Sequence, residues 1–411
     1  MQDLPSSRPG GTPAPQATLA IEGFQGEQDR RDYLIFLLAT FACFLSYSLL
    51  FPAAIVLRQS GLSTTDIGFT LSSSAIPILI ATLGSGLLIA RFGPLPIVIA
   101  GLAIMLAGHA SLEQTRTHFP LAMLSTAIHG IGFGLLMPAQ MVHVKNLLTG
   151  QKGLYYFGIF TGMLQLPNLV GPSFGEYLIS ARGPDQYFLI TAIPVFVALC
   201  VVAGLAIRRS RSARHATHEA SPSGIRYVHL LWNWRVMQPV AAIGLVGFMY
   251  GFVPSYMTTL LADKHVPFAL FFTTFSVFYF GMRIFGFRYL KTFSARQVAI
   301  VGVILMTAAY AVLAINASSV VAVAMAGATF GVGYAVTYPI LSLWVSDLFS
   351  QSERGKPVAL FNAMFLFGIY VFPVVGGAII AAANITATLI LACAIGVCNI
   401  GLLAISQFQR R

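Results

Sequence analysis

The chain has 411 residues, of which 57% are hydrophobic and 9% are charged, and its formal net charge is +11. Soluble domains carry about 25% charged residues, so the composition excludes an ordinary water-soluble protein. It favours a membrane protein whose spans need ~20 apolar residues each. The four cysteines fall in apolar runs without zinc-site spacing and are interpreted as small apolar side chains.

Residues 1–32 are rich in proline, glycine and serine and predict a disordered cytoplasmic tail without a cleavable signal peptide. The remaining apolar runs are long and do not alternate, which favours helices over barrel strands. We therefore predict an all-α membrane protein with twelve spans, at 33–56, 66–90, 95–112, 119–144, 154–180, 186–207, 236–260, 268–290, 296–315, 320–346, 355–381 and 385–406.

Residues 208–235 form the longest polar stretch and predict a cytoplasmic linker between two six-helix bundles, 33–207 and 236–406. The linker contains His215 and His218, which are interpreted as solvated loop residues because no other metal ligands accompany them. Its last part, GIRYVHLLWNW at 224–234, is expected to lie along the membrane interface with Trp232 and Trp234 as anchors.

Lysine and arginine are distributed unevenly between the two sides of the predicted membrane. With a cytoplasmic N-terminus, most of the 24 fall in cytoplasmic segments. The exceptions are Arg58, Arg116, Arg182 and Lys264 in outer loops and Arg283 within a span. Both termini are therefore expected in the cytoplasm. The basic excess indicates topology and contact with anionic lipid rather than nucleic-acid binding.

The two halves of the chain repeat one another at a shift of 201 residues. Gly130, Gly132 and Pro138 then align with Gly331, Gly333 and Pro339, and GPSFGE at 171–176 aligns with FPVVGG at 372–377. Two parallel repeats of six spans are one of the architectures found in secondary transporters.

The stretch 331–377 and the segment GMLQLPNLVGPSFGE at 162–176 carry a resemblance to the major facilitator superfamily, and to its bacterial small-molecule efflux members. The second segment resembles the antiporter motif of the fifth span, with Glu176 in place of the last glycine. The resemblance implies that a glycine–proline contact near the outer end of this span opens and closes during transport. Its members are Gly162, Gly171, Pro172 and Gly175, with Pro373 and Gly376 as second-half counterparts.

The loop between the second and third spans, GLLIARFGPLP at 86–96, resembles the superfamily's GxLaDrxGrk pattern in part. Gly86, Arg91 and Gly93 match, which implies a tight cytoplasmic turn. Ala90 stands where aspartate is usual, so the charge network that latches the inner gate in relatives is mostly lost.

Ionisable groups inside spans are functional candidates. Glu176 is either a proton carrier or a carboxylate that reaches the outer interface. His129 suits proton exchange near neutrality or bridges helices as a neutral ring. Arg283 either holds an anionic substrate or forms a structural pair. Met137, Met141 and His143 resemble copper ligands, but His143 lies ~200° around the helix from Met141, so core packing is the better interpretation.

The resemblance implies that spans one, four, seven and ten line a central cavity. The candidate cavity residues are Tyr47, His129, Tyr250, Tyr256, Tyr334 and Tyr338, with Gln165, Asn168 and Asn362 as secondary members and Arg283 beside them. Tyrosine offers a hydroxyl and a π face, which suit an amphipathic or modestly polar solute.

The favoured function is export of a drug, metabolite or metallophore by proton antiport with alternating access, in the bacterial inner membrane. Proton-coupled uptake is the alternative, and a copper transporter or a membrane sensor is remote. No nucleophile–base pair, metal cluster or GxxxxGK[ST] motif suggests an enzyme or direct ATP drive. We expect a monomer without cofactors whose partners are the solute, protons and lipid.

Overall fold

The computed structural model describes residues 23–24, 26–212, 230, 232–286, 293–349 and 355–405. Among these residues, eleven helical segments are long and apolar enough to cross a membrane. The broken fifth span described below completes the set of twelve, so the predicted all-α fold is confirmed.

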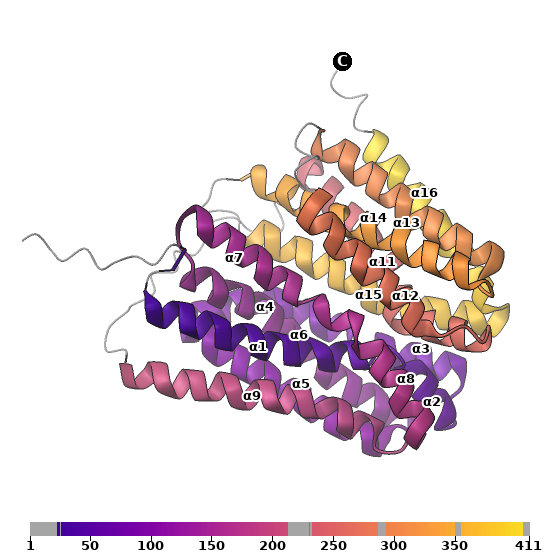
Figure 1. Ribbon diagram of the computed structural model, residues 1–411, viewed down its shortest axis with the longest axis horizontal. Coiled ribbons are helices and arrows are strands. Elements are labelled where there is room, and N and C mark those ends of the chain that lie inside the picture. Colours follow the sequence, from indigo (N-terminus) through magenta and orange to yellow (C-terminus); the bar gives the residue numbers. More distant parts are fainter. Residues whose placement is uncertain are drawn as a thin grey trace, which may run out of the picture.

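Helices α1 to α9 build the first half of the molecule, here called the N half (Figure 1). Their bounds are α1 Glu27–Leu49, α2 Ala53–Gln59, α3 Thr64–Ser72, α4 Ala75–Phe92, α5 Pro94–Thr115, α6 Phe119–Leu147, α7 Gly150–Met163, η1 Leu166–Leu169, α8 Gly171–Arg182 and α9 Tyr187–Ser212. The second half, the C half, contains α11 Trp234–Asp263, α12 Phe268–Gly281, the π-helical turn η2 Met282–Gly286, α13 Ala295–Asn316, α14 Val320–Asp347, α15 Gly355–Ala382 and α16 Ile385–Ile405.

Three predicted spans are interrupted rather than continuous. The fifth span consists of α7, the 3₁₀ turn η1 and α8, because Pro167 and Pro172 each lack the amide hydrogen that an α-helix needs. The first span breaks between α1 and α2 at Pro52, and the second breaks at Ser73 and Ser74 between α3 and α4. The breaks in all three lie toward the same end of the N half.

The boundaries of the predicted tail and linker also differ. Helix α1 begins at Glu27, so residues 27–32 belong to the first span. Asp32 is fully buried. Its carboxylate accepts hydrogen bonds from Arg208 and Arg209 at the end of α9, which compensate the loss of water. Helix α9 continues to Ser212 and α11 begins at Trp234, which shortens the linker.

The tail 1–22 and most of the linker and of the segment 224–234 lie outside the described residues. Within that segment, the Trp232 side chain is 87% exposed and Trp234 is half exposed.

The internal repeat is visible in how the helices cross. A Cβ atom added to Gly101 on α5 would lie 2.9 Å from the carbonyl oxygen of Gly132 on α6. At the equivalent crossing of α13 and α14, a Cβ atom on Gly302 would lie 2.9 Å from the carbonyl oxygen of Gly333. Gly302 and Gly333 lie 201 residues after Gly101 and Gly132, so the same glycine-dependent close approach recurs in each half.

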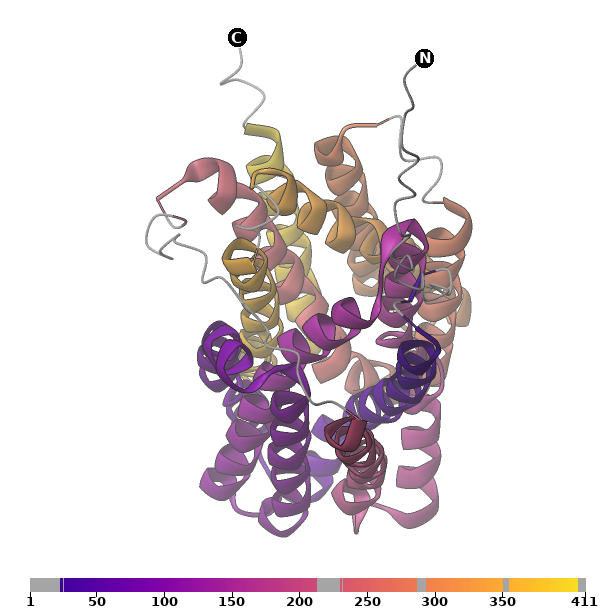
Figure 2. The ribbon, with the colours of Figure 1, turned by 90° about the vertical axis from the view of Figure 1, so that its left-hand side faces the viewer.

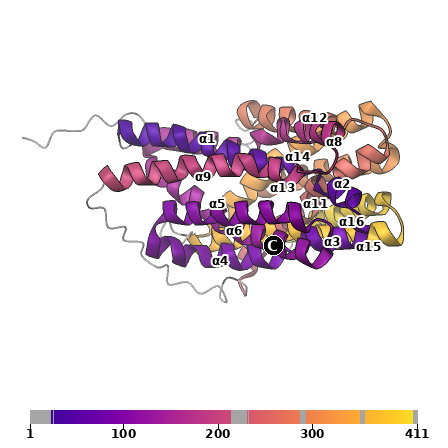
Figure 3. The ribbon, with the colours of Figure 1, turned by 90° about the horizontal axis from the view of Figure 1, so that it is seen from below.

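The two halves lie side by side with their helices running along the same general direction (Figures 1 and 3). One end of the bundle, the termini end, carries the start of α1 and the end of α9, and Figure 2 faces it. At the opposite end, the far end, α2, α3 and α8 of the N half pack against α11, α12 and α15 of the C half. The functional site therefore has to be sought along this contact between halves.

Candidate functional site: the interface between the halves

The contact between halves at the far end is called the far-end seam; it comprises Gly68, Ser72, Tyr256, Pro373 and Gly377. The Val374 amide donates a hydrogen bond of 2.7 Å to the Ser72 hydroxyl, across the two halves. The Tyr256 hydroxyl donates to the Pro373 carbonyl at 2.9 Å. Both bonds use backbone groups at and directly after Pro373 in α15.

Glycine makes the seam close. A Cβ atom on Gly68 would lie 2.6 Å from the Pro373 carbonyl oxygen, and one on Gly377 would lie 3.0 Å from the Thr64 carbonyl oxygen. Helices α3 and α15 therefore touch almost backbone to backbone, without deep interdigitation of side chains. A contact of this kind can separate without leaving large apolar surfaces behind.

Three further interactions join the halves near the seam. Thr258 donates to the Phe51 carbonyl at 3.2 Å, and the Phe51 and Phe272 rings lie 5.3 Å apart. Arg58 and Asp263 form an ion pair of 3.2 Å with both side chains nearly half exposed. The ion pair borders a cavity of about 320 Å³ that opens at the far end.

The fifth-span glycines take a different place from the one expected for a moving contact between halves. A Cβ atom on Gly171 would overlap the Ser48 hydroxyl of α1, and one on Gly175 would lie 2.8 Å from the Tyr187 hydroxyl of α9. Both glycines therefore pack α8 inside the N half. The second-half counterparts of Pro172 and Gly175, which are Pro373 and Gly376, lie at or beside the seam instead.

Glu176 lies on another face of α8, half buried, against the backbone of Ala269 in the first turn of α12. Helix N-termini favour negative charge because their amide groups lack intrahelical acceptors. The carboxylate thus joins α8 of the N half to the start of α12 in the C half.

A small pocket of about 70 Å³ lies just inside the seam, where both halves contribute walls. The N half supplies Tyr47, His109 and His129, and the C half supplies Ser255 and Tyr370. Most of the remaining lining is apolar. His129 therefore lies at the interface between halves, together with a second imidazole, His109, that sequence reasoning missed.

The two imidazoles form a pair. Their rings are edge to face with centroids 4.7 Å apart, and the two Nδ1 atoms are separated by 3.3 Å. His109 Nδ1 also lies 3.0 Å from the carbonyl oxygen of Met105, and its Nε2 lies 3.3 Å from the Ser46 hydroxyl. Ser46 in turn donates to the carbonyl of Thr191 on α9. The pair thus links four helices of the N half.

Four tyrosines of the C half, Tyr250, Tyr279, Tyr334 and Tyr338, form a group called the tyrosine cluster. The Tyr250 and Tyr334 rings stack with centroids 4.7 Å apart. Tyr338 donates a hydrogen bond of 2.6 Å to Asn362. Most of the predicted cavity residues of the C half therefore come together.

Arg283 belongs to the same group, in the π-helical turn η2. Its guanidinium donates to the Tyr279 hydroxyl at 3.0 Å and lies over that ring, 5.3 Å from the centroid. Sequence reasoning did not include Tyr279. Tyr256, by contrast, lies in the seam rather than in the tyrosine cluster.

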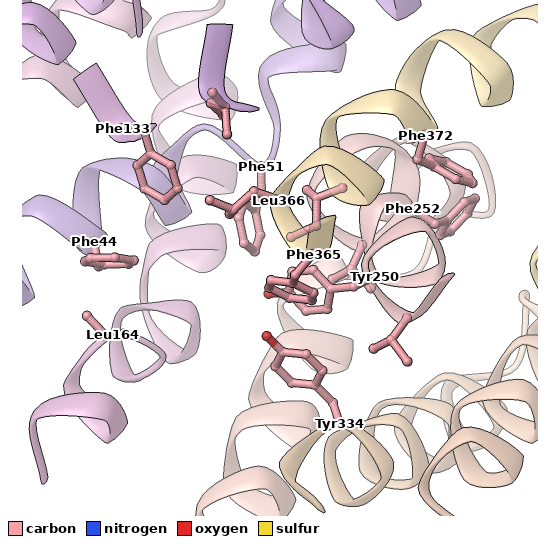
Figure 4. Packing of buried hydrophobic residues seen from close by; sticks show 14 of the residues in the cluster. Phe44, Phe51, Phe133, Leu164, Tyr250, Phe252, Tyr334, Phe365, Leu366 and Phe372 are labelled. Carbon is pink, nitrogen blue, oxygen red and sulfur yellow. The ribbon is translucent and has the colours of Figure 1, made fainter. Parts of the chain in front are cut away.

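Figure 4 shows buried residues of the two halves from close by, with Phe44 and Phe133 on one side and Tyr250, Phe365 and Tyr334 on the other. On the N-half side Tyr47 stacks on Phe133, with centroids 5.1 Å apart. The Asn168 amide of η1 donates to Gln165 at 2.7 Å. The facing surfaces are thus aromatic, with a few hydroxyl and amide groups.

The loop that resembles the superfamily pattern has the predicted tight turn. Helix α4 ends at Phe92 and α5 begins at Pro94, so Gly93 alone connects them, with a φ of +81° that other residues rarely adopt. Arg91 is exposed, and its guanidinium lies 5.2 Å from the centroid of the Phe92 ring. An added Cβ atom on Gly86 would meet nothing within 4 Å.

The three residues considered as copper ligands have other surroundings. Met137 accepts a hydrogen bond from the Gln140 amide at 3.2 Å, and the buried His143 ring packs 4.6 Å from the Phe36 ring. These contacts agree with core packing.

Two parallel bundles of six spans, with a pocket and an aromatic surface between them, define a transporter that moves a solute between two membrane faces. The family model of the Major Facilitator Superfamily matches residues 36–271 and 241–410. The chain belongs to this superfamily and is a membrane transporter, not an enzyme.

The relatives include bacterial drug-resistance proteins. The chain is 20% identical over 353 residues to the quinolone resistance protein NorA of Staphylococcus aureus strain MRSA252, covering 82% of this chain and 87% of NorA. It is 24% identical over 184 residues to multidrug resistance protein 2 of Bacillus subtilis strain 168, covering 44% and 46%.

Solved structures share the fold at lower identity. The nucleoside transporter NupG has a TM-score of 0.73 and 12% identity, covering 92% of this chain and 100% of that chain. The human organic anion transporter MFSD10 has a TM-score of 0.63 and 16% identity, covering 91% and 99%.

Proposed function

We propose that the protein exports a small organic molecule by alternating access, driven by inward movement of protons, with both termini in the cytoplasm. The observation that supports this most is the far-end seam. It holds the halves together through single hydrogen bonds, close glycine contacts and an exposed ion pair, beside a pocket walled by both halves. A seam of this kind suits repeated opening and closing.

The export direction rests on two supports. The curated relatives named above are resistance proteins, and the fifth span carries the motif that resembles antiporters. The solute class rests on the aromatic surfaces that face one another between the halves. Stacked tyrosines with few charges suit a planar, amphipathic molecule of modest polarity.

Transport in inside-out membrane vesicles tests the proposal. Norfloxacin serves as the quinolone probe, and acidification of the vesicle lumen imposes the proton gradient. We expect accumulation that an uncoupler abolishes and that vesicles without the protein lack. No gradient-dependent accumulation of norfloxacin, ethidium or other planar probes would argue against proton-driven export.

The same vesicles distinguish uptake. A proton symporter would instead move its solute out of the lumen, together with protons, under the same gradient. Uridine, chosen because NupG is a nucleoside transporter, is preloaded into the vesicles as the probe for this alternative. Proton-driven uridine efflux without norfloxacin accumulation would favour uptake over export.

A further inference from the structure

The internal repeat shows which side chains the helix packing requires at the positions of the histidine pair. At the shift of 201 residues, His109 and His129 correspond to Tyr310 and Phe330 in the C half. The Tyr310 and Phe330 rings also meet edge to face, with centroids 5.3 Å apart. Two packed rings therefore satisfy the helix crossing in both halves. Packing therefore does not require imidazole rings at this crossing in either half, yet the N half has an imidazole at both positions.

Hydrogen bonding around His109 leaves room for one additional proton. The Met105 carbonyl can only accept, so His109 Nδ1 carries a hydrogen. Ser46 donates its single hydroxyl hydrogen to the Thr191 carbonyl. The Ser46 oxygen can therefore only accept a hydrogen bond, and its donor is His109 Nε2. Both contacts are satisfied together only when His109 carries hydrogens on both nitrogens, which is the imidazolium form.

His129 completes the arrangement. The single hydrogen on His109 Nδ1 is shared between the Met105 carbonyl and the His129 Nδ1 atom 3.3 Å away, so His129 Nδ1 carries no hydrogen and His129 stays neutral with its hydrogen on Nε2. The pair is thus suited to hold one proton, not two, because two like charges at this distance repel strongly.

The other ionisable groups around the pair are few. Tyr47 on α1 and Tyr370 on α15 line the same pocket, and phenols ordinarily titrate well above the range of imidazole. Glu113 lies one turn further along α5. It accepts hydrogen bonds from the amides of Gln186 and Phe188 at 2.9 and 3.0 Å, and its carboxylate is 3.5 Å from Arg116. Its negative charge is already engaged at the start of α9.

We propose that the His109–His129 pair is the proton-binding site that couples the proton gradient to movement of the two halves. The inference rests on the proposed function and names the residues that perform its coupling step. The acceptors of the protonated pair, Met105 and Ser46, belong to the N half and move with it. The closed seam adds mostly apolar walls from the C half around the charge, which is costly, so the protonated pair favours the conformation in which the seam opens and the pocket meets water. The neutral pair favours the closed seam.

The test measures the far end directly, without a transported solute. Spin labels are placed on cysteines at exposed Gln59 of α2 and exposed Asn384 before α16, one in each half, in a background without the four native cysteines. Double electron–electron resonance then gives the label distance in purified protein. We expect the wild-type distances to shift toward longer values on acidification between pH 8 and pH 5.

Two variants remove the imidazoles in different ways. The double variant His109→Tyr/His129→Phe installs the ring pair that the C half already uses, so packing is retained while the proton site is lost. We expect its distance distribution to be independent of pH. The variant Ser46→Ala keeps both imidazoles but removes the acceptor of His109 Nε2, so its transition should require a more acidic medium.

Control variants separate this site from other candidates. His143→Gln removes a buried histidine of α6 that packs on Phe36, and Glu176→Gln removes the α8 carboxylate that contacts the first turn of α12. Both should keep a transition in the wild-type pH range. A pH-dependent distance that persists in the His109→Tyr/His129→Phe protein would overturn the proposal. So would loss of the transition in Glu176→Gln with retention in the histidine double variant.

The outcome is distinguishable from failure of the proposed function. If wild-type vesicles accumulate norfloxacin under a proton gradient but the histidine double variant does so equally well, the pair is not the coupling site and proton-driven export stands. If wild-type vesicles show no proton-driven transport, the proposed function fails first.

Discussion

Single residues at close helix contacts determine how α8 sits in the N half. Gly171 faces the Ser48 side chain so closely that an added Cβ atom would lie 2.7 Å from the Ser48 Cβ atom. Gly158, in α7 of the same span, has nothing within 4 Å of the equivalent position. Comparing alanine substitutions at these two glycines therefore separates the effect of steric crowding from the effect of helix propensity.

We expect Gly171→Ala to destabilise the protein by about 1–3 kcal/mol, because α8 and α1 would have to move apart. Gly158→Ala should have no such cost and should gain up to about 1 kcal/mol of helix propensity. Thermal unfolding in detergent measures both. Equal melting temperatures for the two variants would contradict the packing assigned to Gly171.

At the scale of elements, ion pairs hold α1, the first helix of the N half, against α9, its last helix. Asp32 has no exposed surface and bonds to Arg208 and Arg209, while Asp29, with its side chain 23% exposed, pairs with Arg209 at 2.6 Å. The sequence prediction placed both aspartates in a disordered tail. Propensity and composition could not reveal their partners, which lie about 180 residues away along the chain.

We expect Asp32→Asn to lower stability by about 1–3 kcal/mol, since buried hydrogen-bonding groups of α1 and α9 lose their charged partner. Asp29→Asn removes a pair that water reaches and should cost less. Melting temperatures of the two variants provide the comparison. A larger loss for Asp29→Asn would show that the ion pair nearer to solvent, not the buried carboxylate, holds the two helices together.

For the whole molecule, the proposed alternating access requires the halves to separate at the far end. Arg58 and Asp263 bridge the halves there, whereas Arg116 and Asp185 form an ion pair within the N half. Both pairs lie at helix ends or in connections at the same end of the bundle. The chain therefore offers a matched comparison between a link across the seam and a link beside it.

We expect a short, reducible bifunctional thiol reagent to stop transport when cysteines replace Arg58 and Asp263, because the linked halves cannot part. Reduction should restore transport. The same reagent on cysteines at positions 116 and 185 should leave transport nearly unchanged. Norfloxacin accumulation in vesicles is the measurement, and full turnover in the protein linked at 58 and 263 would contradict a seam that opens.

The sequence alone determined the membrane class, the twelve spans and the two parallel halves. These depend on local apolar runs and on a repeat that can be read along the chain, since lipid leaves each span to satisfy its own backbone. It also identified Gly93 as a turn and most of the tyrosines that face the interface.

Only the tertiary structure decided which distant residues meet. His109 lies beside His129, Gly171 lies against Ser48, and Asp32 lies against Arg208 because helices far apart in the chain cross at those points. The role of the breaks in three spans likewise becomes clear only from the far-end seam, which they help to form. Side-chain contacts between helices depend on crossing positions that no local pattern specifies, so the histidine pair and the seam became visible only in three dimensions.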